Sequence, residues 1–135
     1  MNVLLDTGPW AALLDRSESR HVECVDWFKR FTGRIFSTEA VLTEVLYLVN
    51  FSYPAQAAAI DFVLTGAVTL VPSSVESLTF AKSLMDKYQD LPLDFADATL
   101  VALAHDLNVN HVVSFDRKHF SIYRLFKRRA FVVLP

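Results

Sequence analysis

Acidic side chains follow two apolar runs of this 135-residue chain that have the character of buried β-strands. Asp6 comes directly after the first run, and Asp116 lies two residues beyond the second. If the two runs are neighbouring strands of a parallel sheet, both carboxylates lie in the crevice at the carboxyl ends of the strands, where such sheets bind ligands. Asp97, in the first turn of the helix before the second run, and Glu44, on an earlier helix, are expected at the same crevice.

The chemistry that fits such a cluster is the binding of a hard divalent cation. Several carboxylates brought together repel one another and resist ionisation unless a cation neutralises them, and Mg²⁺ or Mn²⁺ prefers oxygen ligands. The apolar neighbours of Asp6, Glu44 and Asp97 favour this interpretation, since acids in such surroundings are rarely left unpaired. Taken singly, each acid has a structural alternative as a helix cap or turn residue, and for Asp94 the cap is the favoured interpretation.

Other kinds of site find less support. The four histidines have no zinc-ligand spacing, and the chain has no glycine-rich phosphate loop. The triplet Asp6-Thr7-Gly8 also occurs in aspartic proteases, but their fold is all-β, and position 8 lacks the second acid of the haloacid-dehalogenase phosphatases. Cys24 is the only cysteine, so it has no internal disulfide partner and is expected to be a buried apolar residue.

The elements that must position these acids alternate along the chain as strand and helix. Strands are predicted over 2–5, 34–37, 68–71, 111–114 and 131–134. Helices are predicted over 9–14 with Thr7 as the cap, over a segment ending near Phe31, over 38–49, over 54–66, from a capping box of Ser73 and Glu76 to about residue 88, and over 93–107. This alternation favours right-handed crossovers and a parallel sheet covered on both faces, in a single domain over 1–135.

Composition excludes several classes of protein. With 53% hydrophobic and 21% charged residues and only three glycines and five prolines, the chain is expected to form an ordered globular core. The uncharged stretches 45–60 and 62–75 are interrupted by polar residues and prolines, and neither reaches the roughly 20 apolar residues of a membrane-spanning helix. The opening MNVLLD has no basic segment typical of a signal peptide, so a cytoplasmic protein with no membrane association is expected.

Charge is distributed unevenly, although the formal net charge is only −2. From position 117 onward the chain has no acid and carries six of its 13 Lys and Arg residues, namely Arg117, Lys118, Arg124, Lys127, Arg128 and Arg129. A basic C-terminal patch beside an acidic body can attract a polyanion. An ordinary solvated face is an equally open interpretation of these residues.

Four motifs in a fixed order give the chain a resemblance to a known family. They are LLDTGPW, with an acid and a hydroxyl after the first strand; TEVLYLV, with a helical glutamate; LDFADATLVALA; and VVSFDRKHF near the end. Over its whole length the chain resembles the PIN-domain ribonucleases, in particular the VapC toxins of prokaryotic toxin–antitoxin pairs. The resemblance implies an α/β fold with a five-stranded parallel sheet in the order 3-2-1-4-5, flanked by helices.

The resemblance also implies roles for individual residues. The catalytic acids would be Asp6, Glu44, Asp97 and Asp116, and the ligands of Mg²⁺ or Mn²⁺ would be Asp6, Asp97 and Asp116. Thr7 and Ser114 would be supporting hydroxyls, while Asp94 is an acid additional to the family motif. The implied reaction is metal-dependent hydrolysis of RNA phosphodiester bonds, with the basic residues after position 116 holding the RNA backbone.

Two protein partners are implied by the same resemblance: a cognate antitoxin that blocks the active site, and a second copy of the chain in a homodimer. Phe51 and Tyr53 are possible interface residues, although burial in the core is the favoured prediction for both. Two other functions stay open, a PIN-type nuclease of RNA processing with no toxin role and a catalytically inactive module that binds RNA or protein. Four intact acids favour a nuclease over the inactive module.

Overall fold

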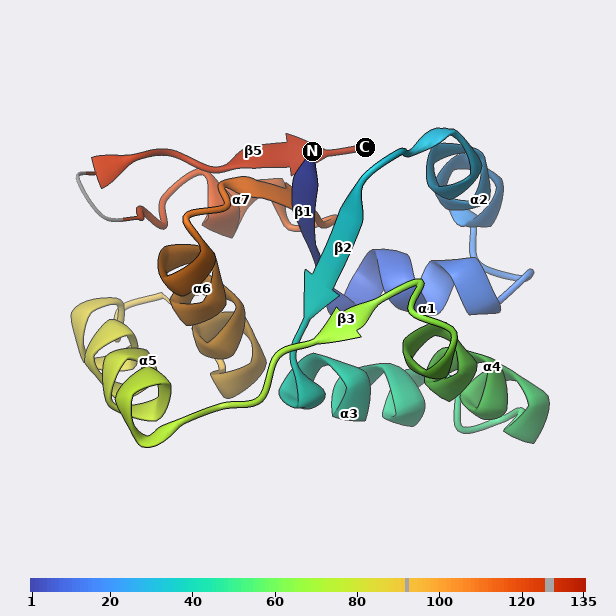
Figure 1. Ribbon diagram of the computed structural model, residues 1–135, viewed down its shortest axis with the longest axis horizontal. Helices are drawn as coiled ribbons and strands as arrows, with labels where there is room; N and C mark the ends of the chain where they lie inside the picture. The colour runs from blue at the N-terminus through green and yellow to red at the C-terminus, as the bar shows by residue number, and fades with distance from the viewer. Residues whose placement is uncertain (92, 126–127) are drawn as a thin grey trace.

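A five-stranded parallel sheet forms the centre of the computed structural model, which describes residues 1–91, 93–125 and 128–135 (Figure 1). The strand order is β3-β2-β1-β4-β5, and every neighbouring pair is parallel. The strands are β1 (Asn2–Leu5), β2 (Arg34–Ser37), β3 (Thr69–Leu70), β4 (His111–Val113) and β5 (Val132–Leu134). The fold class and strand order predicted from the sequence are confirmed.

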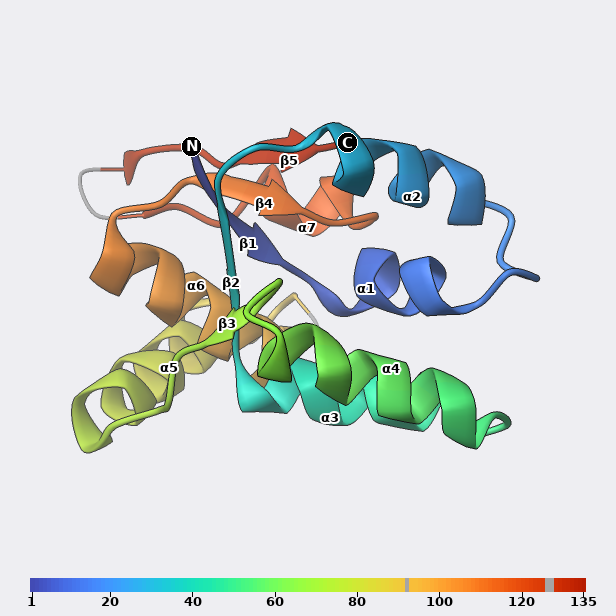
Figure 2. The ribbon, with the colours of Figure 1, turned by 45° about the vertical axis from the view of Figure 1, so that its right-hand side comes forward.

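Helices cover both faces of this sheet. They are α1 (Thr7–Leu14), α2 (His21–Arg30), α3 (Glu39–Leu48), α4 (Tyr53–Leu64), α5 (Val75–Lys87), α6 (Phe95–Leu107) and α7 (Arg117–Phe120). In both views of the ribbon, α5 and α6 lie on one side of the sheet and α1, α2 and α4 on the other (Figures 1 and 2). Helix α3 contacts members of both groups, because it packs on α1, α4 and α6.

The centre of the sheet and helix α6 form the core. Val3, Leu4 and Leu5 of β1 and Val112 of β4 are fully buried, as expected for parallel strands with helices on both faces. Helix α6 is buried throughout residues 98–104 and packs on α5. Within the described residues, no helix is both long and apolar enough to cross a membrane.

Helix starts differ slightly from the predicted ones. Helix α1 begins at Thr7, and its cap is Asp6, because the Asp6 carboxylate accepts a hydrogen bond from the Thr7 N–H; the predicted Thr7 cap is wrong. The capping box of α5 is formed by Ser74 and Ser77, one residue later than the predicted pair, since a serine hydroxyl at the third helical position reaches the N–H of the cap. Helix α7 has no predicted counterpart because one turn is too short for an apolar periodicity.

The predicted burial of Phe51 and Tyr53 is also wrong. Phe51 is 66% exposed and Tyr53 is 77% exposed. Phe51 lies in the turn between α3 and α4, and Tyr53 is the first residue of α4. Figure 2 shows this turn at the periphery of the molecule, away from the sheet. Helical periodicity cannot distinguish an apolar residue that faces the core from one that lies beyond it at the end of a helix.

Candidate active site

Asp6 lies where β1 passes into α1, and its two carboxylate oxygens have different partners. Oδ1 accepts a hydrogen bond of 2.8 Å from the Thr7 N–H, and Oδ2 accepts one of 2.7 Å from the Ser114 hydroxyl. Burial raises the pKa of Asp6 from 3.8 to about 6; the two hydrogen bonds lower it, and the negative charges of Glu44 and Asp116 raise it further. Asp6 therefore resists ionisation in the metal-free protein.

Glu44 reaches the same edge of the sheet from α3. Its Oε2 accepts a hydrogen bond of 3.0 Å from the Thr7 hydroxyl, so Thr7 contacts one acid through its N–H and a second through its side chain. Partial burial raises the pKa of Glu44, the Thr7 hydroxyl lowers it, and the charge of Asp94 and a hydrogen bond with it raise it again. Asp94 thus raises the pKa of Glu44. It also caps α6, the role predicted for it, through a 2.9 Å hydrogen bond from the Asp97 N–H.

Asp97 lies in the first turn of α6, and its pKa is raised further than that of Asp6. Burial raises the pKa of Asp97 from 3.8 to about 8, and four negative charges add to this effect, those of Asp6, Asp94, Asp116 and Glu44 in decreasing order. Charges influence one another in this way only when they are close in a poorly solvated environment. The structure therefore brings the four acids expected at the crevice to one edge of the sheet.

Asp116 follows β4 and is tied to a histidine that the motifs did not single out. Its Oδ1 accepts a hydrogen bond of 3.0 Å from the His119 N–H, and its Oδ2 lies 2.7 Å from His119 Nδ1. The Asp116 N–H donates to the Ser114 hydroxyl at 3.0 Å. Ser114 hence links Asp116 to Asp6. The spacing of three residues between an acid that caps a helix and a histidine is the sequence signal that could have identified His119.

The donor set fits a hard divalent cation in its chemistry. It consists of carboxylate and hydroxyl oxygens, and the acids raise one another's pKa values through a repulsion that a cation relieves. In residues 1–91, 93–125 and 128–135, no three Asp, Glu, His or Cys side chains are close enough to hold a metal ion together as they stand. Oδ2 of Asp6 binds the Ser114 hydroxyl, and Oδ2 of Asp116 contacts His119 Nδ1.

Two of the basic residues lie close to this edge of the sheet. Arg117 and Lys118 are on α7, which begins immediately after Asp116. The Arg117 guanidinium donates to the carbonyl oxygens of Val133, at 3.3 Å, and Pro135, at 2.6 Å, and so holds the end of the chain. Lys118 is exposed.

The other basic residues do not extend this pair into one patch. Arg124 donates to two backbone carbonyls within its own turn. Arg129 donates to the side chains of two asparagines that precede β4, and Arg128 also precedes β5. These positions are at the amino ends of the strands, opposite the acids. Lys127 lies outside the described residues.

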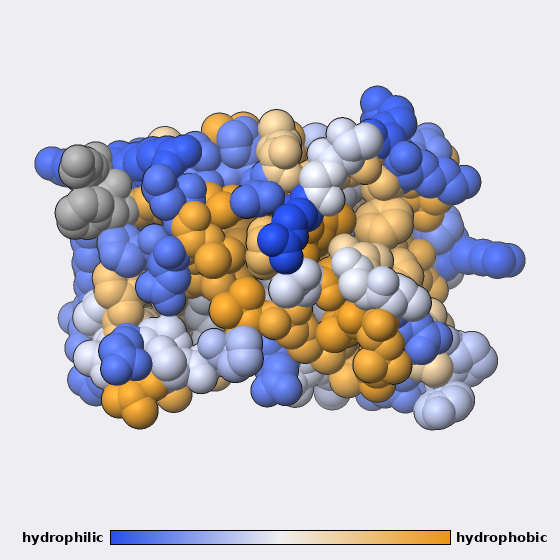
Figure 3. All heavy atoms as spheres, in the orientation of Figure 1, coloured by the Kyte–Doolittle hydropathy of each residue, from blue (hydrophilic) through white to orange (hydrophobic). Residues whose placement is uncertain are grey.

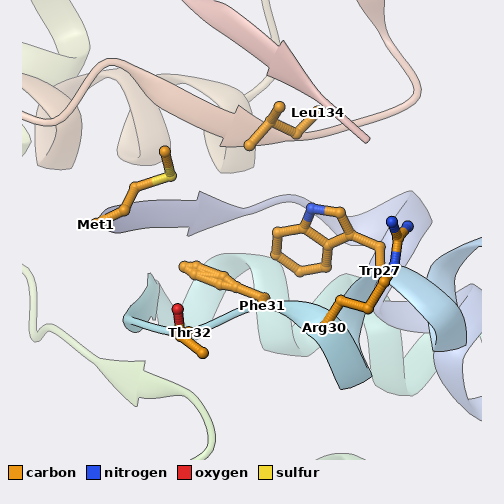
Figure 4. A pocket seen from close by; sticks show the side chains of 6 residues that line it. All are labelled: Met1, Trp27, Arg30, Phe31, Thr32 and Leu134. Carbon is orange, nitrogen blue, oxygen red and sulfur yellow. The ribbon is translucent and has the colours of Figure 1, made fainter.

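A separate pocket of about 480 Å³ lies between the carboxyl end of α2, the start of β1 and the carboxyl end of β5 (Figure 4). Its lining residues are Met1, Trp27, Arg30, Phe31, Thr32 and Leu134. None of them is acidic, and most of them present apolar atoms. This pocket is therefore not the place of the carboxylate chemistry.

Comparison with known proteins agrees with this arrangement. The family model described as "PIN domain" matches residues 3–125. Ribonuclease VapC26 of Mycobacterium tuberculosis (strain ATCC 25618 / H37Rv) is 28% identical over 138 aligned residues, which cover 98% of this chain and 100% of the relative.

Two solved structures share the fold. The crystal structure of Mycobacterium tuberculosis VapC20, described as a Sarcin-Ricin loop cleaving toxin, matches with a TM-score of 0.80 at 22% identity and covers 86% of this chain and 91% of that one. The crystal structure of VapBC2 from Rickettsia felis, bound to a DNA fragment from their promoter, matches with a TM-score of 0.67 at 16% identity and covers 100% of both chains.

Proposed function

Because the chain belongs to the PIN domain family, we propose that it is a metal-dependent endoribonuclease and the toxin of a toxin–antitoxin pair. The observation that carries the proposal is a hydrogen-bonded group of acids at the carboxyl ends of β1 and β4, in which Thr7 joins Asp6 to Glu44 and Ser114 joins Asp6 to Asp116. Burial and the negative charges of these three acids raise the pKa of Asp97 in the first turn of α6. Carboxylates gathered in a poorly solvated place repel one another, and a bound positive charge relieves this repulsion. The 28% identical relative is a ribonuclease, which supports RNA as the substrate.

In this proposal Asp6, Asp97 and Asp116 hold Mg²⁺ or Mn²⁺. Such a cation lowers the pKa of a bound water and offsets the negative charge that develops on a phosphate. Glu44 accepts a proton from the water that attacks the phosphodiester, because a carboxylate with a raised pKa is a better base near neutral pH. Thr7 holds Glu44 in place for this step through its hydroxyl.

The RNA backbone is held by the basic residues nearest the acids. Arg117 and Lys118 are the favoured pair, since α7 begins at the residue after Asp116. Phosphate contacts of this kind position a nucleic acid without reading its sequence.

The toxin role rests on the relatives' names, which include a VapC20 toxin and a VapBC2 complex. A cognate antitoxin is accordingly a proposed partner. Co-expression tests this role: growth arrest by the chain alone, relieved by an antitoxin encoded beside it, is expected. Cleavage without any growth defect would contradict the toxin role and favour an RNA-processing nuclease.

A second copy of the chain is the other proposed partner. Exposed apolar side chains on and between α3 and α4 support a homodimer, namely Tyr47, Leu48, Phe51, Tyr53, Ile60 and Leu64. Figure 3 shows apolar atoms gathered across the middle of one face and over the region of α4. Light scattering of Phe51→Glu tests this surface: a monomer is expected where the unsubstituted chain is a dimer, and an unchanged mass would contradict it.

Cleavage of total cellular RNA tests the nuclease proposal directly. Discrete fragments are expected with Mg²⁺ or Mn²⁺, and none with EDTA or with the Asp6→Ala variant. Asp26→Ala, at an exposed acid on α2, is the matched control and should cleave normally. No cleavage by the folded, antitoxin-free protein under any of these conditions would contradict the proposal and favour a binding module.

A further inference from the structure

Tyr123 has a buried hydroxyl that the proposed mechanism does not use. The residue follows α7 and has 0% exposed surface. Within the part of the chain that the structure describes, its hydroxyl oxygen has no hydrogen-bond partner. A buried hydroxyl without a partner is unfavourable, so such a group calls for an explanation at the place where it lies.

The ring of Tyr123 packs against helix α7, whose cap is Asp116. It stacks on His119, with ring centroids 6.3 Å apart and planes 15° apart, and the Tyr123 N–H donates to the His119 carbonyl. Its edge-to-face neighbours are Tyr88 and Phe120, at 5.3 and 5.4 Å. Since His119 is bonded to Asp116 at 2.7 Å, the packing that fixes Tyr123 also fixes one of the acids.

The surroundings of the hydroxyl are negatively charged. Burial raises the pKa of Tyr123, and the charges of four acids raise it further, with Asp97 first, then Asp116, Asp94 and Asp6. The hydroxyl therefore keeps its proton and is available to donate. Among the acids, Asp97 raises the pKa of Tyr123 most. Within the described residues, the Asp97 carboxylate accepts no hydrogen bond.

We propose that Tyr123 is a positioning residue whose hydroxyl donates a hydrogen bond to the Asp97 carboxylate when a divalent cation is bound at the acidic site. A carboxylate that ligates a cation with one oxygen leaves the other oxygen for an outer hydrogen bond, and such partners orient the ligand. The inference rests on the proposed metal-dependent function. In this inference the Tyr123 hydroxyl has a hydrogen-bond partner, Asp97, only in the metal-bound protein.

Tyr123→Phe removes the hydroxyl and keeps the ring, so it separates the positioning role from packing. Mn²⁺ binding by calorimetry is expected to weaken about tenfold to a hundredfold, while the melting temperature of the metal-free protein stays the same or rises, because an unsatisfied buried group is removed. Tyr88→Phe is the matched control, since it deletes a hydroxyl from the neighbouring ring, and its Mn²⁺ affinity should be unchanged.

Two outcomes would overturn the inference in different ways. Unchanged Mn²⁺ affinity in Tyr123→Phe, with or without a loss of stability, would show that Tyr123 has only a packing role, and the proposed function would stand. No Mn²⁺ binding by the unsubstituted protein would overturn the metal-dependent function, and this inference with it.

Tyrosine labelled with ¹³C at Cζ gives a test without a substitution at position 123. Saturation with Mg²⁺ is expected to shift the Cζ resonance of Tyr123 and to leave that of Tyr88 in place. A Tyr123 resonance that does not move in the Mg²⁺-bound protein would overturn the proposal, even if Tyr123→Phe failed to fold.

Discussion

Ser114 donates a hydrogen bond of 2.7 Å to Asp6, although the two residues are 108 positions apart in the chain. Leu5 of β1 pairs with Val113 of the adjacent strand β4. Asp6 follows Leu5 and Ser114 follows Val113, so this pairing brings the two residues together. The same Ser114 hydroxyl accepts from the Asp116 N–H at 3.0 Å. The buried Ser114 hydroxyl thus positions the side chain of Asp6 and the backbone of Asp116.

Ser114→Ala is expected to lower cleavage about tenfold to a hundredfold, as for other residues that orient metal ligands. Stability should fall by about 1–3 kcal/mol because the buried Asp6 carboxyl loses its donor. Ser37→Ala is the matched control: Ser37 is fully buried on β2, and its hydroxyl donates to the Leu5 carbonyl at 2.8 Å. Denaturant unfolding and RNA cleavage measure both effects. A similar loss of cleavage in both variants would show that Ser114 acts through stability alone.

Thr7→Val is expected to reduce cleavage, because it removes the hydroxyl that binds Glu44 while keeping the shape of the side chain and the N–H that binds Asp6. A loss of about tenfold is consistent with a residue that orients a catalytic group. Thr7→Ser keeps the hydroxyl and should retain most of the activity. The ratio of kcat/KM between the two variants is the measurement, and equal values would remove Thr7 from the mechanism.

Stability of the metal-free protein should fall as the pH rises from about 4 to about 8. Asp6 and Asp97 have ordinary pKa values of 3.8 that rise to about 6 and about 8 in the folded protein. In this range the folded state holds protons that the unfolded state has lost, so higher pH favours unfolding. The shift of Asp6 alone corresponds to roughly 3 kcal/mol, and solvent screening reduces the share of the partly exposed Asp97.

Denaturant unfolding in EDTA at pH 5 and at pH 8 measures this difference. Mn²⁺ should stabilise the protein more at pH 8 than at pH 5, because a metal ion competes with protons for the carboxylates. A stability that rises across this range would contradict the raised pKa values.

Asp97→Asn is expected to abolish cleavage and to leave the fold intact. Loss of a catalytic group that stabilises the transition state costs about a hundredfold or more. In EDTA at pH 8 the variant should be more stable than the unsubstituted protein, because it lacks a carboxyl whose ionisation is opposed by burial and by the charges of Asp6 and the other acids. Below about pH 4 the two stabilities should be similar, since Asp97 is then protonated in the folded and in the unfolded state. An active variant would remove Asp97 from the site.

Lys118→Ala is expected to lower the affinity for RNA and to make this affinity less sensitive to salt concentration. Loss of one contact to a single-stranded backbone should make the slope of log K against log salt less steep by about 0.7. Arg129→Ala is the control, since Arg129 is bound to two asparagines at the opposite end of the strands and its loss should leave this slope unchanged. Titrations in EDTA, where no cleavage is expected, measure the slope. A larger change in Arg129→Ala would place the RNA at the other edge of the sheet.

Much of the fold could be predicted because its signals are local. The apolar strand runs, the Asp94 cap and the helix over 93–107 depend on a few neighbouring residues, and the structure contains each of them with bounds shifted by at most two residues. The exposure of Phe51 could not be predicted, because an apolar side chain at the end of a helix has the same sequence pattern whether it faces a core or solvent. Helix α7 is too short to have a pattern of its own.

The sequence by itself determined that acids stand at the ends of strands, in apolar surroundings and on elements that build a parallel sheet. Only the tertiary structure decided the partners of their oxygens: Ser114 for Asp6, Thr7 for Glu44 and His119 for Asp116. It also separated the basic residues, which are neighbours in the chain, onto opposite ends of the strands. Hydrogen bonds depend on distances of about 3 Å, and such distances are set by how the strands and helices pack rather than by positions along the chain.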